Sequence, residues 1–202
     1  MFIQVIEGRV ADPAALRAAL DQWHQELAPG ADGWLGTTAG VTAGGDHIAV
    51  VRFESPEAAQ RNSRRPEQDR WWAQTATLFE QQPVFRDCPN VETFLAGGSD
   101  QAGFVQVIQG EVSDAARLRK LMPQLAGLEQ FRPEIIGGTV AVDQDGHHAT
   151  QTVYFSSEQA ARAGEAKPPP AELQAALAET DELFQAVRYL DLSEPWLYHP
   201  AR

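Results

Sequence analysis

The sequence predicts an α+β protein of two tandem βαββαβ units, whose antiparallel sheets pack into an α+β barrel with the helices outside. The segment FIQVIEGRV near the start returns later as FVQVIQGEV, and a shift of 102 positions aligns residues 2–60 with 104–162 without a gap. Within each copy, strand and helix patterns follow in the same order. We therefore expect two units, residues 1–98 and 103–202, related by duplication of a whole domain.

The first copy opens with a strand and a helix. FIQVIEG is apolar on both faces, as expected of a strand that is covered on both sides. Asp12 then supplies an N-cap and Pro13 a first helical residue. Apolar residues continue at helical spacing to Leu27, and a Pro-Gly pair ends the helix.

A hairpin and a short helix follow. Residues 34–43 and 47–53 are extended stretches on either side of AGGD, and QDGH occupies the matching turn of the second copy. Ser-Pro-Glu at 55–57 and Ser-Ser-Glu at 156–158 have the composition of helix starts.

The end of each copy is predicted to hold a longer helix and a final strand. The helices are expected at about 67–82 and 171–187, and strands near 91–95 and 196–199 close the two units. A sheet with helices on one face leaves its other apolar face to be buried. We expect the twin sheet to cover it.

The order of elements, with the signal FESPEA from Phe53 to Ala58, resembles the dimeric α+β barrel superfamily, and most closely its antibiotic-biosynthesis-monooxygenase (ABM) branch. Each copy shows the resemblance, so it extends over essentially the whole chain, and it implies ferredoxin-like units. Because members of this superfamily dimerise to complete the barrel, it also implies that the tandem chain is an intramolecular pseudo-dimer, either a monomer or a weak homodimer in solution.

Composition narrows the classes of function. The net charge of −12 opposes binding to nucleic acid or to anionic membranes. The first residues lack a secretory signal, and no apolar run is long enough to span a membrane, so a cytoplasmic protein is expected. Cys88 is the single cysteine, which excludes an internal disulfide, and the histidine spacing suggests no metal site.

Three polar residues stand out. Two of them lie within apolar strands, and the third has no polar counterpart in the other copy. Gln4 and its counterpart Gln106 stand in the middle of an apolar strand, where a buried amide needs hydrogen-bond partners. These glutamines either join neighbouring strands or contact a ligand. Asn62 stands where relatives carry a polar histidine or asparagine, and its counterpart is Gly164.

The tryptophans of the first copy add an aromatic surface. Trp71 and Trp72 align with Ala176 and Leu177, so a retained site is expected in the first copy. The candidate catalytic residues are Asn62, Trp71 and His24, and the candidate substrate-binding residues are Gln4, Trp34 and Trp72. His24 on the first helix points either inward as a general base or outward as a surface residue, and Trp72 either lines the pocket or belongs to the apolar stripe of its helix. Relatives place a tryptophan one helical turn after the asparagine, where this chain has Pro66.

Two functions of different class follow from these residues. The first is a cofactor-independent monooxygenase, an oxidoreductase without metal or flavin, acting on an aromatic or polyketide-like small molecule. The second is a non-catalytic barrel that binds a hydrophobic ligand or serves as a scaffold, and heme binding is a third alternative. An open cavity with convergent polar atoms in the first copy would favour the enzyme.

Overall fold

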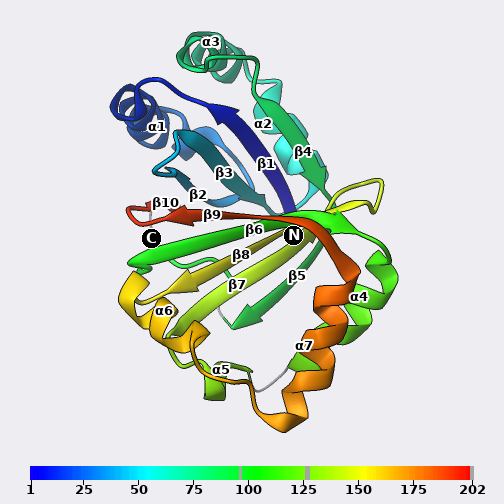
Figure 1. The fold of residues 1–202 in the computed structure, drawn as a ribbon. Coiled ribbons are helices and arrows are strands. Elements are labelled where there is room, and N and C mark those ends of the chain that lie inside the picture. The colour runs from blue at the N-terminus through cyan, green and yellow to red at the C-terminus, as the bar shows by residue number, and fades with distance from the viewer. Residues whose placement is uncertain (96, 126–127, 201–202) are drawn as a thin grey trace. The chain divides into compact units, whose positions relative to one another are not determined.

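The computed structural model describes residues 1–95, 97–125 and 128–200. The chain forms two compact units: unit 1 comprises residues 1–89 with 194–202, and unit 2 comprises residues 90–193. Each unit is an antiparallel sheet of five strands with helices on one face (Figure 1). None of the helices in the described ranges is long and apolar enough to cross a membrane.

Unit 1 has the strand order β10-β2-β3-β1-β4. Its elements are β1 (Phe2–Arg9), α1 (Pro13–Glu26), β2 (Trp34–Val41), β3 (Asp46–Phe53), α2 (Pro56–Ser63), α3 (Pro66–Thr75), β4 (Val84–Cys88) and β10 (Trp196–Tyr198), with short 3₁₀ turns at Ala28–Gly30 and Ala76–Leu78.

Unit 2 repeats this plan with the strand order β5-β7-β8-β6-β9. Its elements are β5 (Asn90–Leu95), β6 (Phe104–Val112), α4 (Ala115–Leu121), a 3₁₀ turn at Met122–Leu125, α5 (Leu128–Phe131), β7 (Ile135–Val142), β8 (His148–Phe155), α6 (Glu158–Glu165), α7 (Ala171–Leu183) and β9 (Phe184–Leu192).

The predicted helix starts are confirmed. The Asp12 carboxylate accepts a hydrogen bond from the Ala15 amide at 3.0 Å, and Pro13 occupies the first turn of α1. Ser55 accepts from the Ala58 amide at 3.2 Å to cap α2. Each cap satisfies an amide that has no partner within the helix, which stabilises it by about 1 kcal/mol.

The last strand of each repeat lies in the sheet of the other repeat. β5 pairs with β7, with Asn90 opposite Val142, and β10 pairs with β2, with Trp196 opposite Ala39. The expectation that each of these strands closes its own unit is therefore wrong. For the duplicated segments themselves we still propose residues 1–98 and 103–202.

Two strands were not predicted from the sequence. The second long helix ends at Leu183, and β9 follows directly, while the first ends at Thr75 and β4 begins at Val84. β4 and β9 pair with β1 and β6. The predicted helix ends at 82 and 187 are wrong because these pairings with strands distant in sequence outweigh the local helical pattern.

The register of the hairpin corrects the gapless alignment of the copies. Phe53 and Phe155 are equivalent and face Trp34 and Ile135, so β7 follows β2 with an offset of 101 rather than 102. Gly36 thus corresponds to Gly137. The shift is compensated in the turn before β3 and β8.

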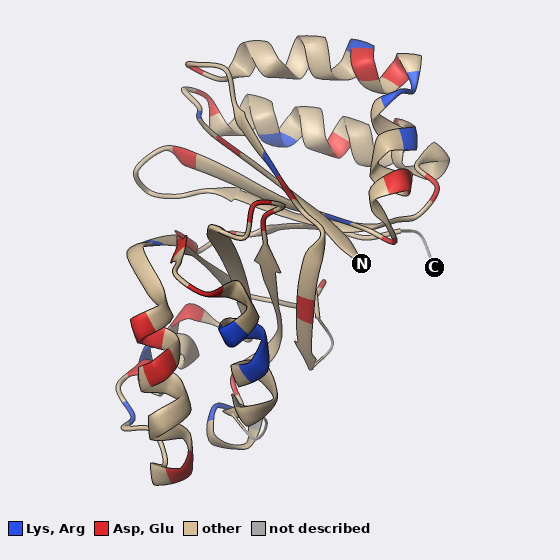
Figure 2. Ribbon diagram, turned by 90° about the vertical axis from the view of Figure 1, so that its right-hand side faces the viewer, with Lys and Arg blue, Asp and Glu red and all other residues tan. Residues whose placement is uncertain are grey.

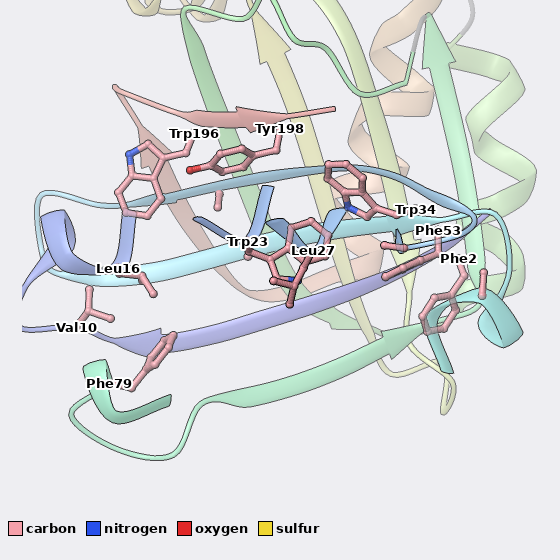
Figure 3. Packing of buried hydrophobic residues seen from close by; sticks show 14 residues of the cluster. Phe2, Val10, Leu16, Trp23, Leu27, Trp34, Phe53, Phe79, Trp196 and Tyr198 are labelled. Carbon is pink, nitrogen blue, oxygen red and sulfur yellow. The ribbon is translucent and has the colours of Figure 1, made fainter. Parts of the chain in front are cut away.

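The core of unit 1 is rich in aromatic side chains. Figure 3 shows Trp196 and Tyr198 projecting from β10, with Phe2 and Phe53 at one end of the sheet and Phe79 at the other. Burial of these apolar side chains contributes about 25 cal/mol per Å² to stability.

Lys, Arg, Asp and Glu are interspersed along the helices and connecting segments (Figure 2).

Candidate functional site

Unit 1 contains a cavity of about 320 Å³ between its sheet and its helices. This volume lies within the range of small-molecule sites. Its aromatic lining consists of Trp23, Phe53, Trp71, Trp72, Phe79 and Phe85. Its polar lining consists of Gln4, Thr37, His47, Asn62, Ser63, Gln68, Asp69 and Thr75.

Three tryptophans on α1 and α3 form an aromatic wall. The ring centroid of Trp71 lies 6.3 Å from that of Trp23 and 6.0 Å from that of Trp72. The Trp23 indole donates to Oε1 of Gln68 at 2.6 Å, and the Trp71 indole donates to the Ala19 carbonyl at 3.0 Å. These bonds hold two of the rings in fixed orientations against which a flat ligand can stack.

Asn62 is a buried hydrogen-bond donor on the wall of the cavity. Its side chain lies on α2 and is 7% exposed. Nη1 of Arg65 donates to Oδ1 of Asn62 at 2.9 Å and to the Leu27 carbonyl at 3.0 Å. Among the described residues, no acceptor bonds to Nδ2 of Asn62. With its oxygen engaged, the amide offers its N–H groups to a ligand oxygen.

His47 is a cavity residue that the sequence analysis did not single out. Its side chain is 4% exposed, and its Nδ1 lies 2.9 Å from the Gly40 carbonyl. Burial lowers the pKa of His47 to about 4, although the hydrogen bond to Gly40 opposes this shift. The imidazole is therefore neutral at physiological pH.

Strand periodicity could have indicated His47. Successive side chains of a strand point to opposite faces, so His47, Ala49, Val51 and Phe53 share one face of β3, and all four line the cavity. The counterpart of His47 in unit 2 is Ala149. The sequence signal for His47 is therefore a histidine at the end of an otherwise apolar strand face, at a position where the second copy has alanine.

Gln4 is held by the neighbouring strand and also lines the cavity. Its Nε2 donates to Oδ1 of Asp87 at 2.8 Å, and in unit 2 Gln106 donates to Asp191 at 3.0 Å. Each aspartate is the residue directly opposite its glutamine in the sheet. The repeated pair joins two strands, in accordance with the structural alternative for these glutamines.

His24 and Trp34 are not among the described residues that line the cavity. Nε2 of His24 lies 2.9 Å from the His199 carbonyl, and the Trp34 indole donates to Oγ1 of Thr37 at 3.0 Å. Trp34 packs against Trp23 with centroids 5.0 Å apart. The structure thus brings together Gln4, Asn62, Trp71 and Trp72, and places His24 and Trp34 behind them.

Unit 2 differs at the position equivalent to Asn62. A side chain added at Gly164 would overlap Glu134 and Arg132, which form a largely buried ion pair there. Unit 2 has its own cavity of about 560 Å³, lined instead by β5 residues such as Phe94 and by Arg119, Met122, Ile135 and Gln151. The combination of an amide donor and a tryptophan wall belongs to unit 1.

Within the described residues, no group of three or more His, Cys, Asp or Glu side chains is arranged to hold a metal ion. Cys88 is buried in β4, outside the lining of the unit 1 cavity.

Sequence comparison adds little to this picture. No family model matches the chain, and no curated protein is significantly similar to it in sequence.

Solved structures show where the fold occurs. A candidate monooxygenase from Lactobacillus acidophilus is 14% identical, with a TM-score of 0.76 over 98% of this chain and 95% of that chain. A second candidate monooxygenase, from Fusobacterium nucleatum, is 8% identical, with a TM-score of 0.77 over 99% and 94%. An anthrone oxidase-like protein is 15% identical, with a TM-score of 0.65 over 97% and 93%. The predicted ABM-like fold of two tandem ferredoxin-like units is confirmed at the level of the fold.

Proposed function

We propose that this chain, which has the fold of tandem monooxygenase-like proteins, is a cofactor-independent monooxygenase for an aromatic or polyketide-like small molecule. Its site is the cavity of unit 1. The observation that carries the proposal is the buried amide of Asn62, whose N–H groups are available at a cavity walled by tryptophans. Fold alone does not determine function, so the proposal depends on these residues.

The reaction we propose converts a methylene group between two aromatic rings into a carbonyl. The substrate and dioxygen give the ketone and one molecule of water. One oxygen atom bonds to the methylene carbon, and the other leaves with both methylene hydrogens. The substrate supplies all the electrons that reduce dioxygen, so the reaction needs no external reductant.

Asn62 and the tryptophans have separate roles in this reaction. The substrate gives up one methylene proton to solvent water, and the negative charge left behind is delocalised onto its ring-bound oxygen, to which the N–H groups of Asn62 would donate hydrogen bonds. Trp71 and Trp72 would stack on the aromatic rings. Gln4, which lines the same cavity, would contact the ligand from the side of the sheet.

The test is oxygen consumption with anthrone as the substrate, together with the absorbance of the quinone product. Asn62→Ala is expected to lower turnover by about 10²-fold, because it removes one preorganised donor. Gln60→Ala, an exposed position on the same helix, is the matched control and should retain wild-type turnover. Absence of turnover, with no effect of Asn62→Ala on binding of any anthrone or quinol, would remove the proposal.

A second function is binding without turnover. It is favoured by one observation: in the part of the chain that the structure describes, His47 contacts the Gly40 carbonyl and two aromatic rings, and none of these contacts is an acidic partner that would complete an acid–base pair. Saturable binding of anthrone under oxygen with no oxygen consumption would identify the chain as a binding protein.

A further inference from the structure

The tautomer of His47 follows from its hydrogen bond. The carbonyl of Gly40 can only accept, so Nδ1 of the neutral ring carries the proton and donates it across 2.9 Å. Nε2 then presents a lone pair and no hydrogen. His47 can therefore accept a hydrogen bond at Nε2.

No residue in the described ranges donates a hydrogen bond to that acceptor. Among the described residues, the contacts of the ring besides Gly40 are aromatic, with centroids at 5.6 Å from Phe79 and 6.1 Å from Trp196. The side chain is 4% exposed and lines the cavity. Nε2 is not among the fully buried side-chain atoms that lack a partner in the described residues, so it is within reach of solvent and can accept a hydrogen bond from a donor held in the cavity.

We propose that the unit 1 cavity selects aromatic ligands that carry a hydroxyl group, and that this hydroxyl donates its hydrogen to Nε2 of His47. The inference rests on the proposed function, since it assumes that the cavity is the aromatic site. Burial lowers the pKa of His47 to about 4, so Nε2 accepts the hydrogen bond without taking the proton. His47 is thus a specificity-determining residue rather than a general base.

Two polar groups in the lining of the cavity define the ligand class. Asn62 offers N–H groups to a ligand oxygen, and His47 offers a lone pair to a ligand hydroxyl. A ligand that satisfies both is an aromatic ketone or quinol that also bears a free phenolic hydroxyl. A site built to bond a hydroxyl rejects the analogue that lacks it, because the buried acceptor is then left unpaired.

The test compares two ligands on the full chain. Isothermal titration calorimetry under anaerobic conditions measures the Kd of 2-hydroxyanthrone and of 2-methoxyanthrone, which cannot donate. We expect the wild type to bind the hydroxy compound about 5- to 10-fold more tightly, the effect of one hydrogen bond. His47→Phe should bind the two compounds equally, and His147→Phe, at an exposed histidine of unit 2, should keep the preference.

The possible failures are distinguishable. Equal affinity of the wild type for both ligands would overturn the inference while leaving the aromatic site in place, and this result does not depend on any variant folding. A preference that persists in His47→Phe would also overturn it. Binding of neither compound, nor of unsubstituted anthrone, would overturn the proposed function itself.

Discussion

Acidification is predicted to destabilise unit 1 through His47. The pKa of this imidazole falls from an ordinary 6.5 to about 4 in the folded chain because burial disfavours the charged form. As the pH falls below 6.5, the unfolded chain takes up a proton that the folded chain does not, so the free energy of unfolding decreases until the pH reaches about 4. At 1.36 kcal/mol per pKa unit, the full effect is about 3 kcal/mol.

Urea denaturation at pH 7.5 and pH 4.5 measures this effect. All five tryptophans lie in the segments that form unit 1, so their fluorescence reports on that unit. The variant His47→Gln keeps an amide N–H for Gly40 but cannot titrate, and it should lose about 2 to 3 kcal/mol less than the wild type between the two pH values. His147→Gln, at an exposed histidine, should behave as the wild type. An equal loss in the wild type and His47→Gln would refute the reasoning.

Three further predictions concern stability and self-association. Tyr198→Phe removes the 2.7 Å hydrogen bond to Asp21 that ties β10 to α1, and should lower the free energy of unfolding of unit 1 by about 1 kcal/mol in urea titrations. Residues 1–99 expressed alone lack β10 and leave β5 without its partner strand, so size-exclusion chromatography should show dimers or aggregates; a stable monomer would contradict the strand exchange. Gly138→Ala places a methyl group against the Phe94 ring and should cost about 1–3 kcal/mol by circular dichroism, whereas in a Phe94→Ala background the same change should cost little.

Local signals in the sequence predicted the local structure well. The caps at Asp12 and Ser55 are as expected, and so are the first strands, the hairpins and the tandem plan. β9 was missed because Phe184–Leu192 continues the apolar spacing of α7, and its pairing with β6 depends on a strand far away in sequence. The exchange of β5 and β10 between sheets has the same cause, since no local pattern specifies which edge a strand joins.

The site was predicted in part. Differences between the copies drew attention to Asn62, Trp71 and Trp72, which the structure brings to one cavity. His47 differs between the copies as well, but its importance depends on burial and on the Gly40 carbonyl, neither of which is written in the sequence. His24 was expected near the chemistry, and a carbonyl of the C-terminal segment holds it elsewhere.

The central claim is that an aromatic ligand binds in the cavity of unit 1. Anaerobic calorimetric titration of anthrone into two matched variants tests it most directly. Ala49→Phe fills the unit 1 cavity, and Gln151→Phe makes the equivalent change in the cavity of unit 2. With folding of both variants checked by circular dichroism, we predict that Ala49→Phe abolishes binding and that Gln151→Phe retains wild-type affinity. Binding that survives Ala49→Phe, or that is lost only in Gln151→Phe, would contradict the account.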